Sequence, residues 1–466
     1  MRFGDDVDLP NYTLSEDMSL QLSFSAATAR HLTVLFPNPR HSFRMAVSLC
    51  LATMMFLSSL VVTASAHGES TPKSGVEDVD SFIIEFANGS TACRAATLAE
   101  IPATRPRPGD VGIPVQQLRP KEAPANQLRA AESDNAATGL TINFVALSQL
   151  QNDADRNTVI AAFERAAAVW TNRIKSPITV SIAIDYGTNL PGGDAFDDNV
   201  IGSTSSRRTL IDYPGARTNL LAGSSGSAET TIYNRLPGSF IPTDVGNGAV
   251  VSVSRSVAFA LGIPVPSAFD PNVATIAFNK NFPFDFNPDD GITFNQTDFI
   301  AVAVHEIGHA LGFTSGAGQG PTSNPTLWDI FRLRPGTNTT TFTTAERVLS
   351  IGGEQVHFTG ENFSVEGLPT TELRLSTGGP EPKVGDGDRR QSSHWKDDGL
   401  NGGRFIGIMD PTISSGTHED ATENDFAALE KIGWNLISPV APPPALPEAS
   451  KRLSTIRRPG RSIASS

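Results

Sequence analysis

The chain has 466 residues, of which 49 are acidic and 36 basic, so its formal net charge is −13. With 39% hydrophobic and 18% charged residues it is not a disordered polyelectrolyte, and it has enough apolar material for one large core or two ordinary ones. The acidic balance argues against a nucleic-acid-binding protein, whose binding surface is basic. Its 40 glycines and 33 prolines favour a loop-rich mixed fold over a helical bundle.

An apolar segment near the N-terminus has the features of a secretory signal peptide. The run 49–62 follows two arginines and precedes the small residues 64–66, so we expect cleavage near His67 and an extracellular or periplasmic protein. An N-terminal membrane anchor is the alternative. Beyond residue 66 no apolar run approaches membrane-spanning length, so we expect no stable anchor after processing. We assign residues 1–66 to this leader and an N-terminal extension.

Residues 67–137 mix one strand-like piece, 82–86, with Pro- and Ala-rich polar sequence. They are expected to be a poorly ordered spacer or a pro-segment. The character changes at residue 138, where we place the start of a catalytic domain that ends at residue 437. Its opening, a strand at 140–145, a helix at 155–174 and an alternating strand at 178–184, predicts a helix packed on a sheet.

The Ser- and Gly-rich tract 202–227 is expected to be a loop, and 250–254 and 273–278 are expected to be further strands. Asp285–Gly291 follows as a turn cluster with calcium-like carboxylate spacing. An EF-hand loop requires Gly at its sixth position and Glu at its twelfth, where this chain has Asp290 and Gln296. We therefore predict a turn, with Ca²⁺ binding only weakly supported.

The strongest motif is His305-Glu306-x-x-His309 within the helical pattern 298–313. Asn295 and Thr297 offer N-caps, Asp298 suits the first turn and Gly312 suits the end. Residues four apart lie on one helix face, so both imidazoles can hold one Zn²⁺ ion. Zinc acidifies water to a pKa of about 7 and polarises a carbonyl, and Glu306 can accept the water's proton and pass it to a leaving amine. A capped, solvated or core pair of histidines is the alternative interpretation.

A catalytic zinc needs a third protein ligand, and here the sequence resembles the metzincin family of zinc peptidases. The match covers His305, Glu306, His309 and Gly312, but Ser315 stands where the third ligand of that family is expected. His394, in a Ser-His-Trp context, is followed fifteen residues later by Met409 in Ile-Met-Asp-Pro, which resembles the methionine turn. This layout is similar to the leishmanolysin-like branch and to exported bacterial metallopeptidases with the same helix. The resemblance implies His394 as third ligand and Met409 beneath the site.

Other third ligands stay open. His394 could be a surface histidine, and His357 is expected to face solvent or a neighbouring strand. His418 is a reserve ligand or a substrate contact. A glutamate ligand is also conceivable, with Glu346 and Glu354 available.

Residues 316–393 form an insertion that we expect to wall one side of the cleft, with strand-like pieces at 347–351 and 372–375. Thr422–Asp425 predicts a capping box that opens a helix closed by Gly433, and 438–466 is expected to be a disordered tail. Cys93 remains the only thiol once the leader is removed, so no intrachain disulfide can form. In several metzincins a pro-segment cysteine blocks the zinc, but no known switch motif surrounds Cys93, which is otherwise an incidental buried or free cysteine.

The sequence therefore predicts an α+β protein with a metzincin-like catalytic domain, a mixed twisted sheet, an active-site helix and a loop-rich lower subdomain. Its expected function is that of a secreted zinc-dependent endopeptidase acting on proteins or peptides, with one catalytic Zn²⁺. The rival is a secreted binding or surface protein that keeps a structural zinc on the same scaffold without turnover. A fourth protein ligand would favour this rival.

Overall fold

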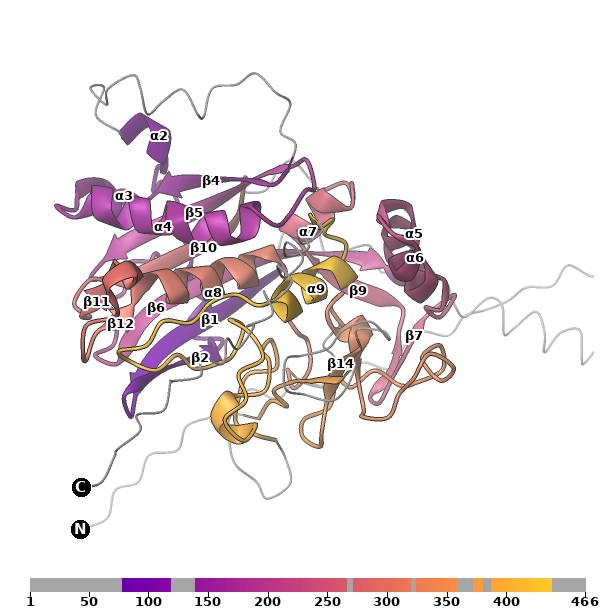
Figure 1. Cartoon of the computed structure of the whole chain (residues 1–466). Helices are drawn as coiled ribbons and strands as arrows, with labels where there is room; N and C mark the ends of the chain where they lie inside the picture. Colours follow the sequence, from indigo (N-terminus) through magenta and orange to yellow (C-terminus); the bar gives the residue numbers. More distant parts are fainter. Residues whose placement is uncertain are drawn as a thin grey trace, which may run out of the picture. The chain divides into compact units, whose positions relative to one another are not determined.

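A mixed β-sheet with helices packed on it organises the protein (Figure 1). The computed structural model describes residues 78–118, 139–265, 271–319, 324–358, 372–379 and 387–437, all within one compact unit, Val76–Ser466. The proposed leader and the C-terminal tail lie outside these residues. In the described ranges, no helix combines the length and apolarity needed to cross a bilayer.

Within the described residues, the main sheet has eight strands and runs in the order β2-β1-β6-β10-β5-β4-β3, with β9 also pairing with β6. These strands are β1 (Asp78–Ala87), β2 (Ser90–Ala95), β3 (Ile113–Pro114), β4 (Thr141–Ala146), β5 (Thr179–Gly187), β6 (Val200–Asp212), β9 (Val250–Ser254) and β10 (Asn272–Asn279). β4, β5 and β10 are parallel, whereas β6, β1 and β2 are each antiparallel to their neighbours. The predicted α+β class with a mixed sheet is confirmed.

Two longer helices, α4 (Arg156–Thr171) and α8 (Phe299–Leu311), lie side by side on one face of this sheet (Figure 1). The helices are α2 (Val115–Leu118), α3 (Ser148–Asn152), α4 (Arg156–Thr171), α5 (Tyr213–Gly223), α6 (Ser227–Asn234), α7 (Arg255–Ala260), α8 (Phe299–Leu311) and α9 (Glu423–Lys431). The apolar positions of α4 are buried, as their helical spacing predicts. Trp170 of α4 donates a hydrogen bond from Nε1 to the Val304 carbonyl of α8, 3.0 Å away, so the two helices are tied together.

The tract 202–227, expected to be a loop, instead forms most of β6, all of α5 and the start of α6. Composition misled the prediction because Ser and Gly are poor strand formers, whereas β6 is stabilised by pairing with three strands, β1, β9 and β10. One helix signal was present in the sequence: Asp212 caps α5 by accepting from Gly215 N, and Pro214 lies in the first turn.

The segment expected as a poorly ordered spacer or pro-segment contributes to both edges of the main sheet. β1 and β2 form a hairpin that pairs with β6, and β3 pairs with β4 at the opposite edge. The strand expected at 82–86 lies within β1. Asn88 and Gly89 connect the two strands with positive φ angles of 54° and 84°, the conformation that an Asn-Gly turn favours. Removal of this segment on maturation stays a prediction, and residues 119–138 are outside the described part.

The insertion carries a small antiparallel sheet below the main one, with β13 (Arg332–Leu333), β14 (Val356–Phe358) and β15 (Glu372–Arg374). The strand expected at 347–351 does not form; Arg347 makes only an isolated bridge to Thr243. Further short pieces are β7 (Ile241–Thr243), β8 (Gly246–Gly248), β11 (Phe284–Asp285), β12 (Thr297–Asp298) and the 3₁₀ turns η1 (Ile101–Thr104), η3 (Pro288–Asp290), η4 (Asp329–Phe331) and η5 (Asp398–Leu400). The capping box of Thr422 and Asp425 at the start of α9 is confirmed.

Candidate metal centre

The helix α8 holds the His-Glu-x-x-His motif, and every residue of this helix is buried. Its N-cap is Asp298, whose carboxylate accepts from Ile300 N at 2.8 Å and Ala301 N at 3.1 Å. The expected N-caps, Asn295 and Thr297, are therefore wrong, because both precede the residue that caps the helix. The helix ends at Gly312 as predicted, and the φ of 119° there is one that residues with a Cβ rarely adopt.

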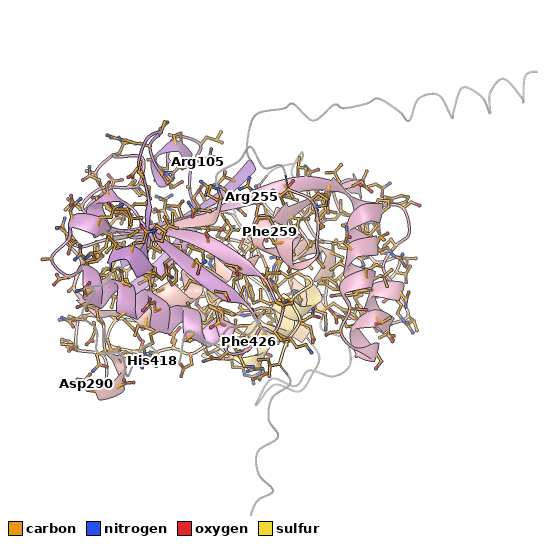
Figure 2. The ribbon with its side chains drawn as sticks, turned by 90° about the horizontal axis from the view of Figure 1, so that it is seen from above. Arg105, Arg255, Phe259, Asp290, His418 and Phe426 are labelled. Atoms are coloured by element: carbon orange, nitrogen blue, oxygen red, sulfur yellow. The ribbon has the colours of Figure 1, made fainter. Side chains whose placement is uncertain are left out.

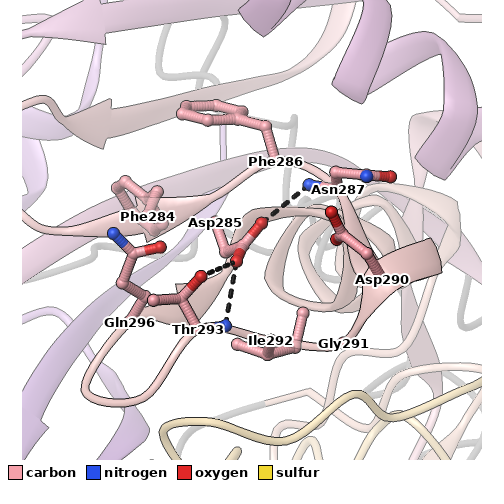
Figure 3. A pocket seen from close by; sticks show the side chains of 9 residues that line it. All are labelled: Phe284, Asp285, Phe286, Asn287, Asp290, Gly291, Ile292, Thr293 and Gln296. Carbon is pink, nitrogen blue, oxygen red and sulfur yellow. Dashed lines mark hydrogen bonds between the residues drawn. The ribbon is translucent and has the colours of Figure 1, made fainter.

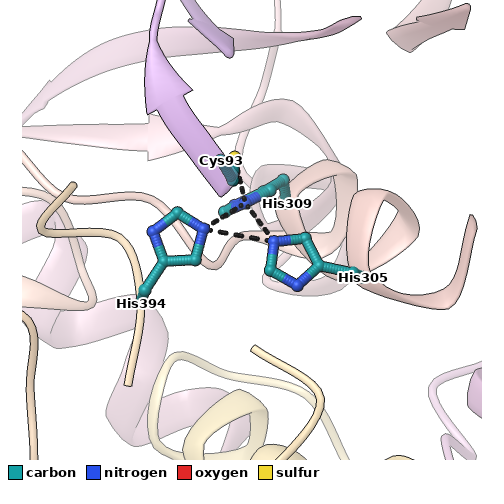
Figure 4. A group of neighbouring side chains, drawn as sticks. All are labelled: Cys93, His305, His309 and His394. Carbon is teal, nitrogen blue, oxygen red and sulfur yellow. Dashed lines mark hydrogen bonds between the residues drawn. The ribbon is translucent and has the colours of Figure 1, made fainter. Parts of the chain in front are cut away.

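The three predicted histidine ligands come together (Figure 4). His305 Nε2 lies 3.1 Å from His394 Nε2 and 3.2 Å from His309 Nε2, and the third separation is also 3.2 Å. All three side chains are buried. His394 is thus not a surface histidine, although 85 residues separate it from His309.

The tautomer of each ring follows from its other nitrogen. Nδ1 of His305 faces the Ile408 carbonyl at 2.7 Å, and the Nδ1 atoms of His309 and His394 face carbonyls at 2.6 and 2.9 Å. A carbonyl can only accept, so each Nδ1 carries the proton and each Nε2 presents a lone pair. Three lone pairs then converge on one point, an arrangement that a cation at that point stabilises.

Cys93 completes the cluster. Its Sγ lies 3.7 Å from His309 Nε2, and one ligand atom from each of the four side chains falls within 4.8 Å of all the others. This buried Cys-His-His-His group could hold a metal ion. Four ligands around a tetrahedral zinc would be about 3.4 Å apart for two nitrogens and about 3.6 Å for nitrogen and sulfur, so the donor set and spacing fit zinc.

Sequence reasoning left Cys93 open between an incidental cysteine and a latency switch, because no motif marks it. Its place depends on long-range pairing, since β2 is held at the centre by β1, which pairs with β6, and by hydrogen bonds to Pro411 and Ile413. The sole sequence signal is that Cys93 is the one thiol beyond the leader. Burial, together with the negative charge of Glu306, raises the pKa of this thiol, whereas a coordinated thiol is deprotonated outright.

Glu306 follows His305 in α8, lines the same small cavity as His305 and Cys93, and is fully buried. Neither carboxylate oxygen has a hydrogen-bond partner of normal geometry among the described residues. Burial raises the pKa of Glu306 to about 8, and the nearby Thr204 hydroxyl opposes this rise only in part. Glu306 and Cys93 line a small cavity of about 10 Å³, close to the space that one water needs.

Met409 packs directly under the helix, where the resemblance expects it. A Cβ added to Gly308 would lie 2.4 Å from Met409 Sδ, so glycine at this helix position permits the close approach. Asp425 of α9 holds the turn by accepting from Ile408 N at 3.0 Å and from Trp395 Nε1 at 2.7 Å. The helix α9 therefore fixes both the chain at Ile408 and Met409 and the residue after His394.

The hairpin of β1 and β2 fills the space between β6 and the chain that follows the methionine turn. On the metal side, the Phe82 ring stacks on His309 with centroids 4.1 Å apart. On the far edge of β2, Cys93 N donates to the Pro411 carbonyl and Thr91 N to the Ile413 carbonyl, both at 2.9 Å. The hairpin thus covers the cluster.

The remaining histidines and the alternative glutamates lie elsewhere. His357 is buried, packs against the Trp328 ring with centroids 4.4 Å apart and lies in β14 between β13 and β15, so of the two expected settings it has neighbouring strands and not solvent. His418 contacts Asp298 and Asp420 and is not part of the cluster. Glu354 pairs with Arg374, and Glu346 is exposed.

His418 lies beside the loop that carries Asp290 (Figure 2), and its contact with Asp298 connects this loop to the N-cap of α8. Partial burial lowers the pKa of His418, but the hydrogen bond to Asp298 and the negative charges of Asp298 and Asp420 outweigh it and raise the pKa above 6.5. The stabilisation by the charged imidazole is therefore present in full below pH 6.5 and is lost as pH rises through the folded-state pKa.

We expect His418→Asn to lower the free energy of unfolding by about 0.5 kcal/mol near pH 5.5, a small effect because solvent screens a partly exposed pair. The loss should be smaller near pH 8.5, where less of the imidazole is charged. Urea unfolding at both pH values, with wild type alongside, measures this difference. An equal loss at both values would contradict a contribution from the charged imidazolium.

The loop Asp285–Gly291 and its neighbours line an open pocket (Figure 3). Asp285 accepts from Asn287 N, Thr293 N and Thr293 Oγ1 at 2.7–2.9 Å, and Asp289 pairs with Arg165. The expected turn is confirmed by η3. Among the described residues, the ligand atoms of this loop do not gather as those of the cluster at Cys93 do, and Ca²⁺ binding gains no support.

Comparisons with protein-family models, with curated proteins and with solved structures found no match for this chain.

Proposed function

We propose that the protein is a zinc-dependent endopeptidase with a metzincin-like catalytic domain, held latent in this conformation. The observation that carries the proposal is the convergence of three buried Nε2 lone pairs beside the unpaired carboxylate of Glu306. Three histidines plus one further position is the ligand arrangement of catalytic zinc. The methionine beneath His305 and His309 supports the metzincin-like architecture.

The residues of the site divide the chemistry among them. His305, His309 and His394 would hold Zn²⁺, which when bound supplies Lewis acidity toward a carbonyl and toward water. Glu306 follows His305 in the helix and would accept the proton of the attacking water, then give it to the leaving amine. Its desolvated surroundings strengthen both its basicity and its electrostatic effect on the developing charge.

A peptide substrate is favoured by what lies next to the cluster. β1 runs antiparallel to β6 from the Asp78–Arg208 pair to the Glu85–Val200 pair, and its Phe82 side chain rests on His309. An extended chain therefore fits along this part of β6 with a side chain at the metal. A peptide could pair with the same edge by β-augmentation once the hairpin has moved.

Cys93 supports latency, because a thiolate in the fourth position excludes the water that hydrolysis needs. The same four ligands also describe the rival, a structural zinc in a closed site. Glu306 favours the enzyme: a purely structural site has no use for a buried carboxylate without a partner, which costs folding free energy.

Replacing Cys93 with alanine separates the two functions. In the enzyme we expect at least about a tenfold gain in casein hydrolysis by the full chain, abolished by a chelator and restored by Zn²⁺, because one anchor of the hairpin and the blocking ligand are lost together. In the rival, the variant binds zinc more weakly and gains no activity. A Cys93→Ala protein that binds zinc yet hydrolyses no casein, even after limited proteolysis of the hairpin, would contradict the proposed function.

Export to an extracellular or periplasmic compartment is part of the proposal and is supported by the apolar run 49–62 with its flanks. Protein or peptide substrates are the proposed partners. The net charge of −13 argues against nucleic acid.

A further inference from the structure

The chain that leaves α8 is tied to one buried carboxylate. Ser315, at the position where the metzincin pattern expects a metal ligand, donates from Oγ to Asp329 Oδ1 at 2.5 Å. Gly316 N and Thr326 N donate to Asp329 Oδ2 at 2.7 and 2.9 Å. Asp329 is fully buried, so it closes the loop after the metal helix into a fixed turn.

Arg332 connects this carboxylate to the loop that carries His394. Its Nε donates to Asp329 Oδ1 at 3.2 Å, and its two terminal nitrogens donate to Gln355 Oε1, to the Ser376 carbonyl and to the Ser392 carbonyl. The side chain is fully buried. A buried charge is tolerated only when it is paired and hydrogen-bonded, and here the partners come from four separate segments.

The residues on both sides of His394 are held by the same network. Ser393 Oγ accepts from Ser315 N at 2.8 Å, and Ser376 N donates to the His394 carbonyl at 3.1 Å. Ser376 Oγ also donates to the Trp395 carbonyl at 2.6 Å. The carbonyls of Ser392, His394 and Trp395 are therefore bonded to the insertion, and the Ser393 side chain is bonded to the chain that follows α8.

The geometry points to Asp329 and Arg332 as positioning residues that preset His394 as a metal ligand. This role rests on the metal site of the proposed function. It adds a role for the insertion, which holds the third ligand in place. A ligand 85 residues from His309 must otherwise be ordered when the ion binds, and that loss of chain entropy weakens binding. When folding has already fixed His394, metal binding no longer includes this loss of chain entropy.

Arg332→Lys tests this role, with Arg347→Lys as the matched control. Arg347 is equally buried in the same insertion, but its guanidinium donates to the carbonyls of Ile330, Phe342 and Ala345 and does not contact the His394 loop. Lysine keeps the charge but cannot reach acceptors spread around a planar fork. Both variants are therefore expected to lose thermal stability, but only one should change the metal site.

The measurements are Zn²⁺ affinity by competition with a chelator and the visible absorption of the Co²⁺-substituted full chain. For Arg332→Lys we expect zinc binding about tenfold weaker and a Co²⁺ spectrum altered from that of wild type. For Arg347→Lys we expect wild-type affinity and spectrum. An equal loss of affinity in both variants, or no loss in Arg332→Lys, would overturn the inference.

A milder variant covers the case in which Arg332→Lys does not fold. Ser315→Ala removes one hydrogen bond to Asp329 and should weaken Zn²⁺ binding a few-fold; unchanged affinity would overturn the inference. The proposed activity fails separately: wild-type protein could bind zinc and depend on Arg332 yet hydrolyse no peptide. Conversely, if the protein is an active peptidase and its Arg332→Lys variant binds zinc normally, the proposed function stands and only the positioning role of Asp329 and Arg332 is refuted.

Discussion

Glu306→Gln is expected to lower peptide hydrolysis by about 10²–10⁴-fold while the protein keeps its zinc. Glutamine has nearly the same shape but cannot accept a proton, so the loss measures general-base catalysis. The metal ligands are unchanged, and removal of a buried unpaired carboxylate should leave the fold at least as stable. Casein hydrolysis by Cys93→Ala protein, with and without the Glu306 change, and zinc content by elemental analysis provide the measurement.

Glu229→Gln is the matched control for this substitution. Glu229 is also a buried glutamate, but it lies on α6 and is bonded to Ser225 N and Tyr233 Oη. Its change should affect stability and leave the turnover of folded protein as it was. Undiminished proteolysis in Glu306→Gln would refute the catalytic role, and loss of zinc in that variant would show that its effect is structural.

His394→Ala should weaken zinc binding by at least about 100-fold. Structural zinc sites bind with roughly 10–16 kcal/mol shared among four ligands, so each ligand accounts for about 3 kcal/mol. The effect should exceed that of either other downstream histidine. Chelator competition on the three alanine variants, of His394, His357 and His418, gives the ranking.

His357 is the informative control because its ring is as buried as that of His394. Truncating it leaves a cavity between aromatic rings and should destabilise the fold, with a much smaller effect on zinc affinity than the loss of His394. If His357→Ala or His418→Ala reduced zinc affinity more than His394→Ala did, the third ligand assigned here would be wrong.

The insertion and the hairpin contact the cluster and its loops through different residues. The insertion supplies Asp329 and Arg332, which hold the His394 loop, whereas the hairpin brings Cys93 and Phe82 into contact with the histidines. Under the proposed function, latency and ligand positioning would therefore be carried by different parts of the chain. Loss of one should leave the other measurable, which is why the Cys93 and Arg332 experiments have separate outcomes.

Local pattern was a reliable guide where local forces decide the structure. The spacing of His305 and His309 already places both rings on one helix face, and the apolar positions of α4 already define its buried side. Gly312 and the capping box at Thr422 mark helix ends through backbone conformations that only neighbouring residues control. These features needed no knowledge of the rest of the fold.

Pattern failed where pairing across the chain decides. β6 was expected to be a loop because its serines have weak strand preference, yet it is held by three partner strands. Asp298, assigned to the first turn of α8, is instead its N-cap, since boundaries of one residue depend on hydrogen bonds that composition does not specify.

The sequence by itself determined the paired histidines and the adjacent glutamate, because the motif spacing puts them on one helix, whereas the preference for His394 and Met409 came from the resemblance to the metzincin pattern. Only the tertiary structure decided that Cys93 is the fourth member of the cluster and that Asp329 and Arg332 fasten the third ligand. Both depend on contacts between residues tens to hundreds of positions apart, such as the 216 between Cys93 and His309. Such contacts leave no periodicity in the chain, since they arise only when separate strands and loops pack into one core.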